Sequence, residues 1–164
     1  MNTPAMTIRP AKPEDAVEMV RLHRAAVQAV SDADYPANVR EAWSPPPTPE
    51  REAWLVGRIT DSEIFARVAD DGGRIVGFVF ASPLPAKVHA LYVHPDEGGR
   101  GVGRALLEAA EAHARAQGAG EMVLMASRNA VRFYEACGYT RGEDTTQALA
   151  DGTVMDAVHM RRGL

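Results

Sequence analysis

The sequence predicts a single domain of mixed α and β structure, in which hairpin strands and one strand–helix–strand unit contribute to the sheet. Three observations support this prediction. The chain has 164 residues, of which 46% are hydrophobic, and this is enough for one core. Two strand-like segments flank an Asp-Asp-Gly-Gly turn. Farther along, a strand, an amphipathic helix and another strand follow in order. We expect the domain to span residues 1–164, with a folded core over about 6–162.

The N-terminal part predicts a short strand over Met6–Arg9 and then a helix over residues 13–30. Pro13 and the two acidic residues after it suit the first turn of a helix. One face of this helix is apolar and would pack against a sheet. That face carries Ala16, Met19, Val20, His23, Val27 and Val30, with His23 expected at the edge of the core.

The segment from Ser31 to Glu50 contains five prolines and no helical period, so we expect a long loop. Loops of this length are commonly either functional lids or linkers, and the sequence alone favours neither. A short helix over about residues 50–58 is expected to close the segment.

A β-hairpin follows, with strands over Glu63–Ala69 and Arg74–Ala81. The second strand is apolar on both faces, which predicts a central strand covered from both sides. Strict alternation would put Ile75 and Val79 on one face, and Val76, Phe78 and Phe80 on the other.

The strand–helix–strand unit covers Val88–His94, residues 101–117 and Glu121–Ala126. The helix has one apolar side, and Gly118 is expected to end it.

A second short helix is predicted over Asn129–Cys137, with Ala130, Phe133 and Cys137 on its apolar face. A strand begins near Tyr139, and the turn at Asp151-Gly152 indicates a closing hairpin that ends near Met160.

Composition excludes several classes of protein. The chain has 18 basic and 22 acidic residues and a formal net charge of −4, so it has no general attraction for nucleic acid or anionic lipid. No apolar run approaches the roughly 20 residues of a membrane span, and Met1–Pro10 lacks the pattern of a secretory signal. We therefore expect a soluble cytoplasmic protein. The single cysteine, Cys137, fits a reducing compartment and is expected to pack in the core.

A glycine-rich turn, Gly98-Gly99-Arg100-Gly101-Val102-Gly103, joins a predicted strand to a predicted helix. Free backbone N–H groups and the helix dipole make such a turn a site for an anion such as a pyrophosphate, and Arg100 and Arg104 add positive charge. A flexible connection without a ligand is the alternative. The turn lacks the Lys-Ser/Thr of a P-loop after Gly103, and the third glycine of a dinucleotide fingerprint falls on Arg104.

Three segments together closely resemble the GCN5-related N-acetyltransferase (GNAT) family. They are Leu91-Tyr92-Val93-His94-Pro95, the run from Gly99 to Leu107, and the run Asn129-Ala130-Val131-Arg132-Phe133-Tyr134-Glu135-Ala136-Cys137-Gly138-Tyr139. The order of elements agrees over nearly the whole chain. The resemblance implies an α/β (α+β) fold with a mixed, largely antiparallel central sheet flanked by helices. In it, the parallel strands at 88–94 and 121–126 splay apart to form a cofactor cleft.

The resemblance also implies acetyl-coenzyme A as co-substrate, with no metal. The backbone of Leu91 and Val93 would hold the pantetheine arm and acetyl group, and the amides from Gly99 to Arg104 would hold the pyrophosphate. The family's side-chain donor at the start of the turn is replaced here by Gly98. The implied cofactor contacts are Leu91, Tyr92, Val93, Gly98, Gly99, Arg100, Gly101, Val102, Gly103, Arg104 and Asn129.

Acetyl transfer to an amine needs a proton acceptor and a proton donor for the departing thiolate. The resemblance places Tyr134 near the coenzyme sulfur as the acid, although a packed aromatic residue is the structural alternative. Lys87 stands where many members carry a glutamate base. His89, two residues farther and so on the same face of the strand, is the candidate base; Asp96, Glu97 or a water chain are the alternatives. The five histidines form no metal-ligand pattern.

The family commonly builds its acceptor site from the loop after the first helix, which here holds Tyr35 and Trp43. These residues either shape an acceptor pocket or anchor the proline-rich segment to the core. The function implied is transfer of an acetyl group to a primary amine of a small molecule or peptide, by direct attack in a ternary complex. An acyl-coenzyme A-binding regulatory module with weak or no catalysis is the alternative, and a homodimer is compatible with the sequence.

Overall fold

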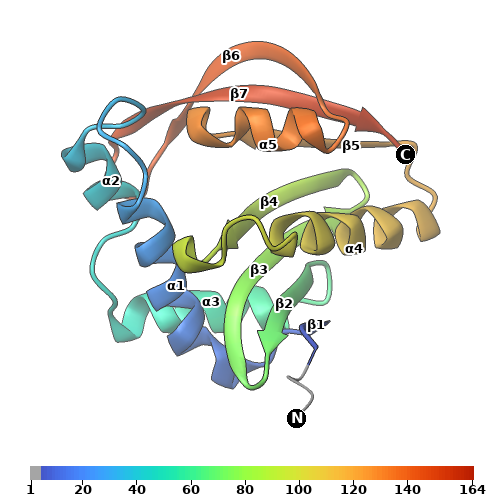
Figure 1. Cartoon of the computed structure of the whole chain (residues 1–164), viewed down its shortest axis with the longest axis horizontal. Helices are drawn as coiled ribbons and strands as arrows, with labels where there is room; N and C mark the ends of the chain where they lie inside the picture. The colour runs from blue at the N-terminus through green and yellow to red at the C-terminus, as the bar shows by residue number, and fades with distance from the viewer. Residues whose placement is uncertain (1–4) are drawn as a thin grey trace.

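A computed structural model of the chain describes residues 5–164 and contains one sheet of seven strands (Figure 1). The strands are β1 (Thr7–Pro10), β2 (Phe65–Asp71), β3 (Arg74–Pro83), β4 (Ala86–Val93), β5 (Glu121–Ala126), β6 (Thr140–Ala148) and β7 (Val154–Gly163). Their order is β1-β2-β3-β4-β5-β7-β6, and every neighbouring pair is antiparallel except the parallel pair β4 and β5. The predicted mixed, largely antiparallel sheet is confirmed.

Five α-helices flank the sheet. They are α1 (Ala16–Gln28), α2 (Ala37–Trp43), α3 (Pro49–Thr60), α4 (Val102–Ala116) and α5 (Val131–Ala136). Helices α1 and α3 pack on one face of β2 and β3, and α4 packs on the other, while α5 lies beside β6 (Figure 1). Within residues 5–164, no helix combines the length and the apolar character needed to cross a membrane.

Strand β3 is buried on both faces, as predicted, because it separates two apolar clusters. The predicted faces of two residues are wrong. Val76 belongs to the cluster under α4 together with Val79, whereas Ile75 belongs to the cluster under α1 with Phe78. The cause is an irregularity in the pairing with β2, where the extra residue reverses the alternation of side chains.

The segment predicted as one long loop, 31–50, contains helix α2 and the start of α3. Sequence periodicity missed α2 because the helix has only seven residues and buries none of them deeply. Tertiary contacts hold it instead. Arg24 donates to the carbonyl oxygen of Ser44 at 2.6 Å, and Trp43 Nε1 donates to Tyr92 Oη at 3.0 Å. This segment therefore forms a fixed wall beside the sheet.

The short helix after β5 is a 3₁₀ turn (Arg128–Ala130) followed by α5. Its buried stripe differs from the predicted one. Val131 and Tyr134 lie in the core, while Phe133 is only partly buried. Cys137 is buried against the same cluster, so the prediction that it packs in the core is confirmed.

A buried carboxylate ties helix α4 to the distal strands. Glu111 of α4 is 2% exposed and accepts from Tyr139 Oη at 3.1 Å and from Arg162 at 2.6 Å. Arg162 belongs to β7 and is paired in register with Met122 of β5. A buried carboxylate needs such partners, because an unpaired charge in the core is costly. The contact therefore fastens the two sides of the sheet at one end.

Gly77 of β3 sets how closely α4 approaches the sheet. A Cβ atom at this position would lie 2.9 Å from Leu106 Cδ1 and 3.0 Å from both Val102 Cγ1 and the Tyr92 carbonyl oxygen. Because these neighbours are backbone or packed core atoms, we expect Gly77→Ala to lower the free energy of unfolding by about 1–3 kcal/mol. Urea denaturation measures the change.

Gly57 of α3 offers the matched control. A Cβ atom there would meet no atom within 4 Å, and the residue is exposed in a helix. Gly57→Ala should therefore stabilise the protein by up to about 1 kcal/mol through helix propensity. Equal stabilities for Gly77→Ala and the wild type would contradict the close packing of α4 on β3.

Candidate functional site

Strands β4 and β5 are hydrogen-bonded neighbours only at their beginnings. Their parallel register comprises Lys87 with Val123 and Val88 with Leu124. Beyond Val88, within the described residues, the β4 edge facing β5 has no strand partner. The predicted splay is confirmed, and a cleft opens where the strands part.

A β-bulge lies where the splay begins. In the pairing with β3, Ala81 faces Val88 and Phe80 faces Ala90, so His89 is the extra residue. A bulge bends its strand and redirects the side chain it carries. It also interrupts the alternation from which a shared face of Lys87 and His89 was predicted.

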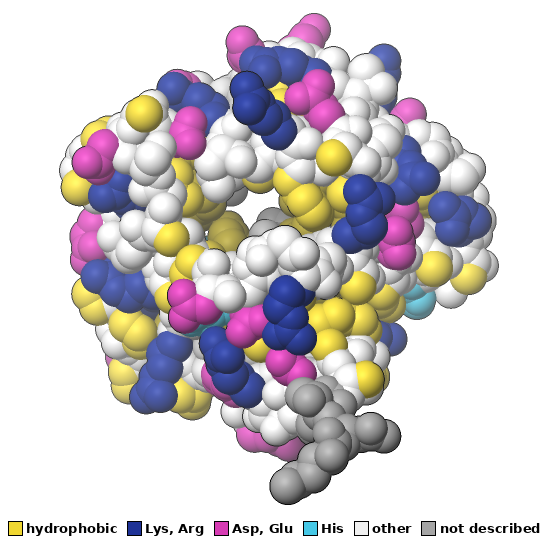
Figure 2. Space-filling view, in the orientation of Figure 1, with side chains coloured by type: hydrophobic (Ala, Val, Ile, Leu, Met, Phe, Trp, Pro, Cys, Tyr) yellow, Lys and Arg dark blue, Asp and Glu magenta, His cyan; other side chains and the backbone are white. Residues whose placement is uncertain are grey.

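The cleft is lined by residues of both diverging strands and of the elements around them. Leu91 of β4, Met125 of β5, Tyr134 of α5, Gln147 of β6 and Met155 of β7 all contribute. Figure 2 shows the molecular surface hollowed between the two parts of the molecule, with hydrophobic side chains bordering the opening. A second cavity adjoins it, lined by the end of β4, the end of α1 and the 127–130 turn.

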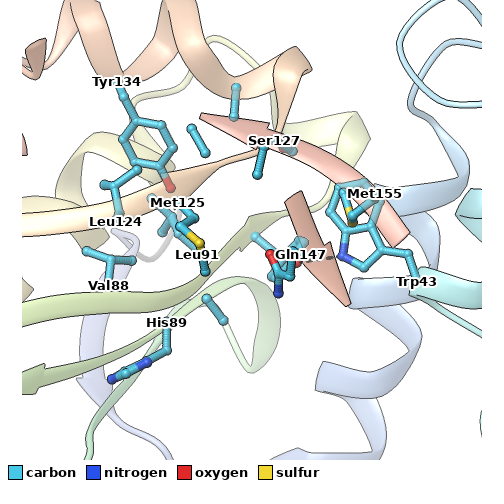
Figure 3. A pocket seen from close by; sticks show the side chains of 15 residues that line it. Trp43, Val88, His89, Leu91, Leu124, Met125, Ser127, Tyr134, Gln147 and Met155 are labelled. Atoms are coloured by element: carbon cyan, nitrogen blue, oxygen red, sulfur yellow. Dashed lines mark hydrogen bonds between the residues drawn. The ribbon is translucent and has the colours of Figure 1, made fainter. Parts of the chain in front are cut away.

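The Tyr134 hydroxyl points into the cleft between β4 and β5 (Figure 3). The residue is 7% exposed, and its hydroxyl has no hydrogen-bond partner within residues 5–164. Burial, with smaller contributions from Tyr92 and Cys137, raises the pKa of the phenol far above its ordinary value. The group therefore stays protonated at neutral pH and can donate a proton into the cleft.

His89 also lines the cleft, with its ring directed away from the Tyr134 hydroxyl (Figure 3). Ser82 Oγ donates to the Pro85 carbonyl oxygen at 2.9 Å and lies 2.9 Å from His89 Nε2. When the serine donates to Pro85, His89 Nε2–H donates to Ser82 Oγ, and this tautomer leaves the lone pair on Nδ1. Burial and the nearby charges of Arg58 and Lys87 lower the pKa of His89, so the ring is neutral at pH 7.

The glycine turn leads from β4 into α4, as predicted. Gly99 and Gly101 have φ values of +79° and +78°, a left-handed conformation that side chains disfavour. Within residues 5–164, the amide N–H groups of 99–104 donate to no backbone carbonyl outside the helix. The turn therefore presents several free donors at the positive end of the α4 dipole, an arrangement suited to an anion.

The two arginines of the turn are engaged with other groups. Arg100 forms ion pairs with Asp71, at 3.0 Å, and with Glu97. Arg104 donates to the carbonyl oxygen of Ala136 at 3.0 Å, which links α4 to the end of α5. The free donors of the turn are its backbone amides. Gly103 lies against the Phe133 ring, since a Cβ atom there would be 3.1 Å from it.

The other residues expected to contact a cofactor surround the second cavity. Leu91, Tyr92, Val93 and Asn129 line it, and Asn129 is exposed. The Tyr92 side chain points toward α1, where the His23 ring lies 4.3 Å away, and burial raises the pKa of its phenol to about 12. Its hydroxyl accepts from Trp43.

Trp43 and Tyr35 occupy different positions. Trp43 lines both cavities. Tyr35 is 1% exposed and lines neither, and its ring lies 5.6 Å from that of Trp43. The Tyr35 hydroxyl donates to the carbonyl oxygen of Asp156 at 2.5 Å and accepts from the Arg128 amide at 2.8 Å. Tyr35 thus supports from behind the wall of the cleft on which Trp43 lies.

The alternative bases do not line the cleft. Glu97 is held by Arg74 at 3.0 Å and by Arg100, and the hydrogen bond from Arg100 contributes most to lowering the pKa of its carboxyl. Asp96 is exposed on the same short turn. Within residues 5–164, no group of three or more His, Cys, Asp or Glu could hold a metal ion.

Sequence reasoning missed several residues that line the cleft, among them Met125, Ser127, Gln147 and Met155. Met125 and Ser127 follow the start of a predicted strand, so their place at its splayed end could have been inferred. Gln147 and Met155 gave no such signal, because their position depends on how the β6–β7 hairpin folds back beside β5.

Comparison with known proteins agrees with this geometry. The model of the acetyltransferase (GNAT) family matches residues 24–139. A GCN5-related N-acetyltransferase structure from Rhodopseudomonas palustris, "Aminotransferase, Class-II", is 31% identical with a TM-score of 0.88, over 100% of this chain and 99% of that one. The structure of yncA from Salmonella typhimurium, solved with its cofactor acetyl-CoA, is 25% identical with a TM-score of 0.69, over 98% and 95%.

A curated relative matches over a shorter part of both proteins. Mycothiol acetyltransferase of Thermobispora bispora is 38% identical over an alignment of 86 residues, which covers 45% of this chain and 29% of that protein. The match therefore spans less than a third of that relative. Because the family model covers well over half of the chain, and the splayed sheet accords with it, the chain belongs to the acetyltransferase (GNAT) family.

Proposed function

We propose that the protein is an acetyl-coenzyme A-dependent N-acetyltransferase, which transfers the acetyl group to a primary amine by direct attack in a ternary complex. One observation carries the proposal. The phenol of Tyr134 is protonated and points into the cleft between β4 and β5, and β4, which borders that cleft, leads through the glycine turn to the free amides at the start of α4. We infer that β4 connects a site for a thiolate acid with a site for a pyrophosphate.

The chain's own groups suit acetyl-coenzyme A as a substrate. We assign the pyrophosphate to the backbone amides of 99–104, since these donors are free and the Arg100 guanidinium is paired with carboxylates. The open edge of β4 at Leu91 and Val93 would bind the pantetheine arm, and Asn129 would meet it from the opposite wall.

Transfer begins when the neutral amine attacks the thioester carbonyl carbon and the carbon–sulfur bond breaks. Tyr134 would give its proton to the departing thiolate, because the phenol stays protonated up to a high pH. His89 would take a proton from the attacking amine at Nδ1, directly or through water, because its ring is neutral and that nitrogen is free.

A regulatory module that binds acyl-coenzyme A without turnover remains the second candidate, since Lys87 replaces a carboxylate. A binding module has no use for a phenol that points into the cleft and bonds to no other described residue, whereas an enzyme can use it as a proton donor. The position of Tyr134 therefore favours the enzyme.

Tyr134→Phe tests the acid. We expect kcat to fall about a hundredfold, because the thiolate must then leave without a proton donor. The dissociation constant for coenzyme A should stay the same, since the ring is retained. Release of free thiol measures turnover, and calorimetry measures binding.

Tyr139→Phe is the matched control. Its hydroxyl donates to Glu111 outside the cleft lining, so the change should lower thermal stability and leave kcat near the wild-type value. A Tyr134→Phe enzyme with unchanged kcat would remove Tyr134 from the mechanism.

His89→Asn tests the base and its pH dependence. Because the pKa of His89 is lowered, the wild-type base is neutral at pH 7, and activity should decline only as the pH falls through a value below about 6.5. The variant should lose about tenfold or more in kcat and lack that decline. The raised pKa of Tyr134 should keep the alkaline limb above about pH 10. Profiles of kcat against pH check both limbs; an identical acid limb in the variant would assign it to another group.

Gly101→Val tests the pyrophosphate site. Valine is strained at φ +78° and should displace the amides at the start of α4, so we expect the dissociation constant for coenzyme A to rise at least about tenfold. Gly118→Val, at the other end of α4 with φ +90°, imposes similar strain away from the cleft. The control should bind coenzyme A normally, and equal affinity in both variants would contradict the assignment.

A further inference from the structure

The cleft carries almost no charge. Among residues 5–164, the lining of both cavities contains no Lys, Arg, Asp or Glu side chain. Arg128 and Asp156 are chain neighbours of the lining residues Ser127, Met155 and Ala157, yet they form an ion pair with each other. The imidazole of His89 is neutral at pH 7. An occupant of this space therefore meets no full countercharge.

One wall of the cleft is a fixed aromatic surface. The Trp43 ring is positioned by the bond to Tyr92 Oη, and it contacts the Tyr35 and Tyr92 rings edge-on, at 5.6 Å and 6.3 Å between centroids. Tyr35 is itself held by two backbone groups. Because Trp43 lines both cavities, an apolar group in the cleft can contact this fixed indole.

The facing residues are adaptable. Met155 lies beside Trp43, and Met125 lines the cleft on the side of Leu91 and Tyr134 (Figure 3). Unbranched thioethers adjust to differently shaped apolar partners. Gln147 lines the same cleft, and its neutral amide can bind a polar but uncharged substituent (Figure 3).

We propose that the acceptor is a primary amine whose remaining part is apolar and carries no second charge, seated against Trp43, Met125 and Met155, with Gln147 as the specificity-determining polar contact. This inference rests on the proposed function. Polyamines and amines with a carboxylate are disfavoured, because a second charge would enter the cleft without a partner.

Three amines of the same chain length test the proposal. Hexylamine ends in a methyl group, 1,6-diaminohexane in an ammonium group and 6-aminohexanoate in a carboxylate. Because all three carry the same reacting amine, differences in their affinity report the effect of the other end. The chain has two tryptophans, and Trp54 is 64% exposed on α3. In Trp54→Phe, Trp43 is the remaining tryptophan, and its emission reports binding with coenzyme A present.

We expect hexylamine to shift the Trp43 emission and to bind at least about tenfold more tightly than either charged analogue. Tighter or equal binding of 1,6-diaminohexane or 6-aminohexanoate would overturn the proposal. An emission that does not respond to hexylamine would also overturn it. Trp43→Ala should raise the KM for hexylamine, whereas Trp54→Ala should leave it unchanged.

Gln147→Glu provides a gain-of-function test, since it adds a charge with almost no change in shape. Binding of 1,6-diaminohexane relative to hexylamine, measured as the ratio of their association constants, should rise about tenfold or more in Gln147→Glu. Gln147→Leu should not raise this ratio. An unchanged ratio in Gln147→Glu would remove Gln147 from recognition. If hexylamine binds but no amine releases thiol from acetyl-coenzyme A, the proposed function fails while the specificity of the cleft stands.

Discussion

The separation of β4 from β5 is the constraint on which the site depends. These strands share two residue pairs, and the bulge at His89 bends β4 away directly after Val88. A regular parallel ladder would saturate the backbone of both strands and close the cleft. The bulge instead leaves the edge of β4 open and places a histidine at the point of divergence.

The cleft stays open because both of its ends are held. At the paired end, Glu111 joins α4 to Tyr139 and Arg162, so the distal strands cannot shift freely against the helix. At the open end, helix α2 brings Trp43 against Tyr92 of β4, and Tyr35 reaches across to the backbone near Arg128. Segments more than 90 residues apart thus hold one wall.

Burial is the main cause of the pKa shifts of Tyr134 and His89. Burial disfavours the charged form of any group, so it raises the pKa of the Tyr134 phenol and lowers the pKa of the His89 imidazole. Both groups are then neutral at pH 7, one as a proton donor and the other as an acceptor. Their neutrality matches the uncharged lining of the cleft.

Much of the fold could be read from local chemistry. The glycines at 99 and 101 identified a strand-to-helix turn, and the Asp-Asp-Gly-Gly turn identified the β2–β3 hairpin, because left-handed turns demand residues without side chains. Alternation and helical period located nearly every strand and helix. They failed at Val76 and His89, where bulges shift the alternation, and at α2, which is too short to show a period.

By itself, the sequence determined the order of the elements, the glycine turn and the motifs that carry the family resemblance. It also determined which side chains, such as that of Met125, carry no charge. Only the tertiary structure decided that Arg100 pairs with Asp71 and Glu97, that Tyr35 supports the wall instead of lining it, and that Gln147 and Met155 line the same cleft as Trp43. The physical reason is distance along the chain. Local periodicity reports which face of an element is buried, whereas partners dozens of residues apart are chosen by packing and charge pairing in the folded state.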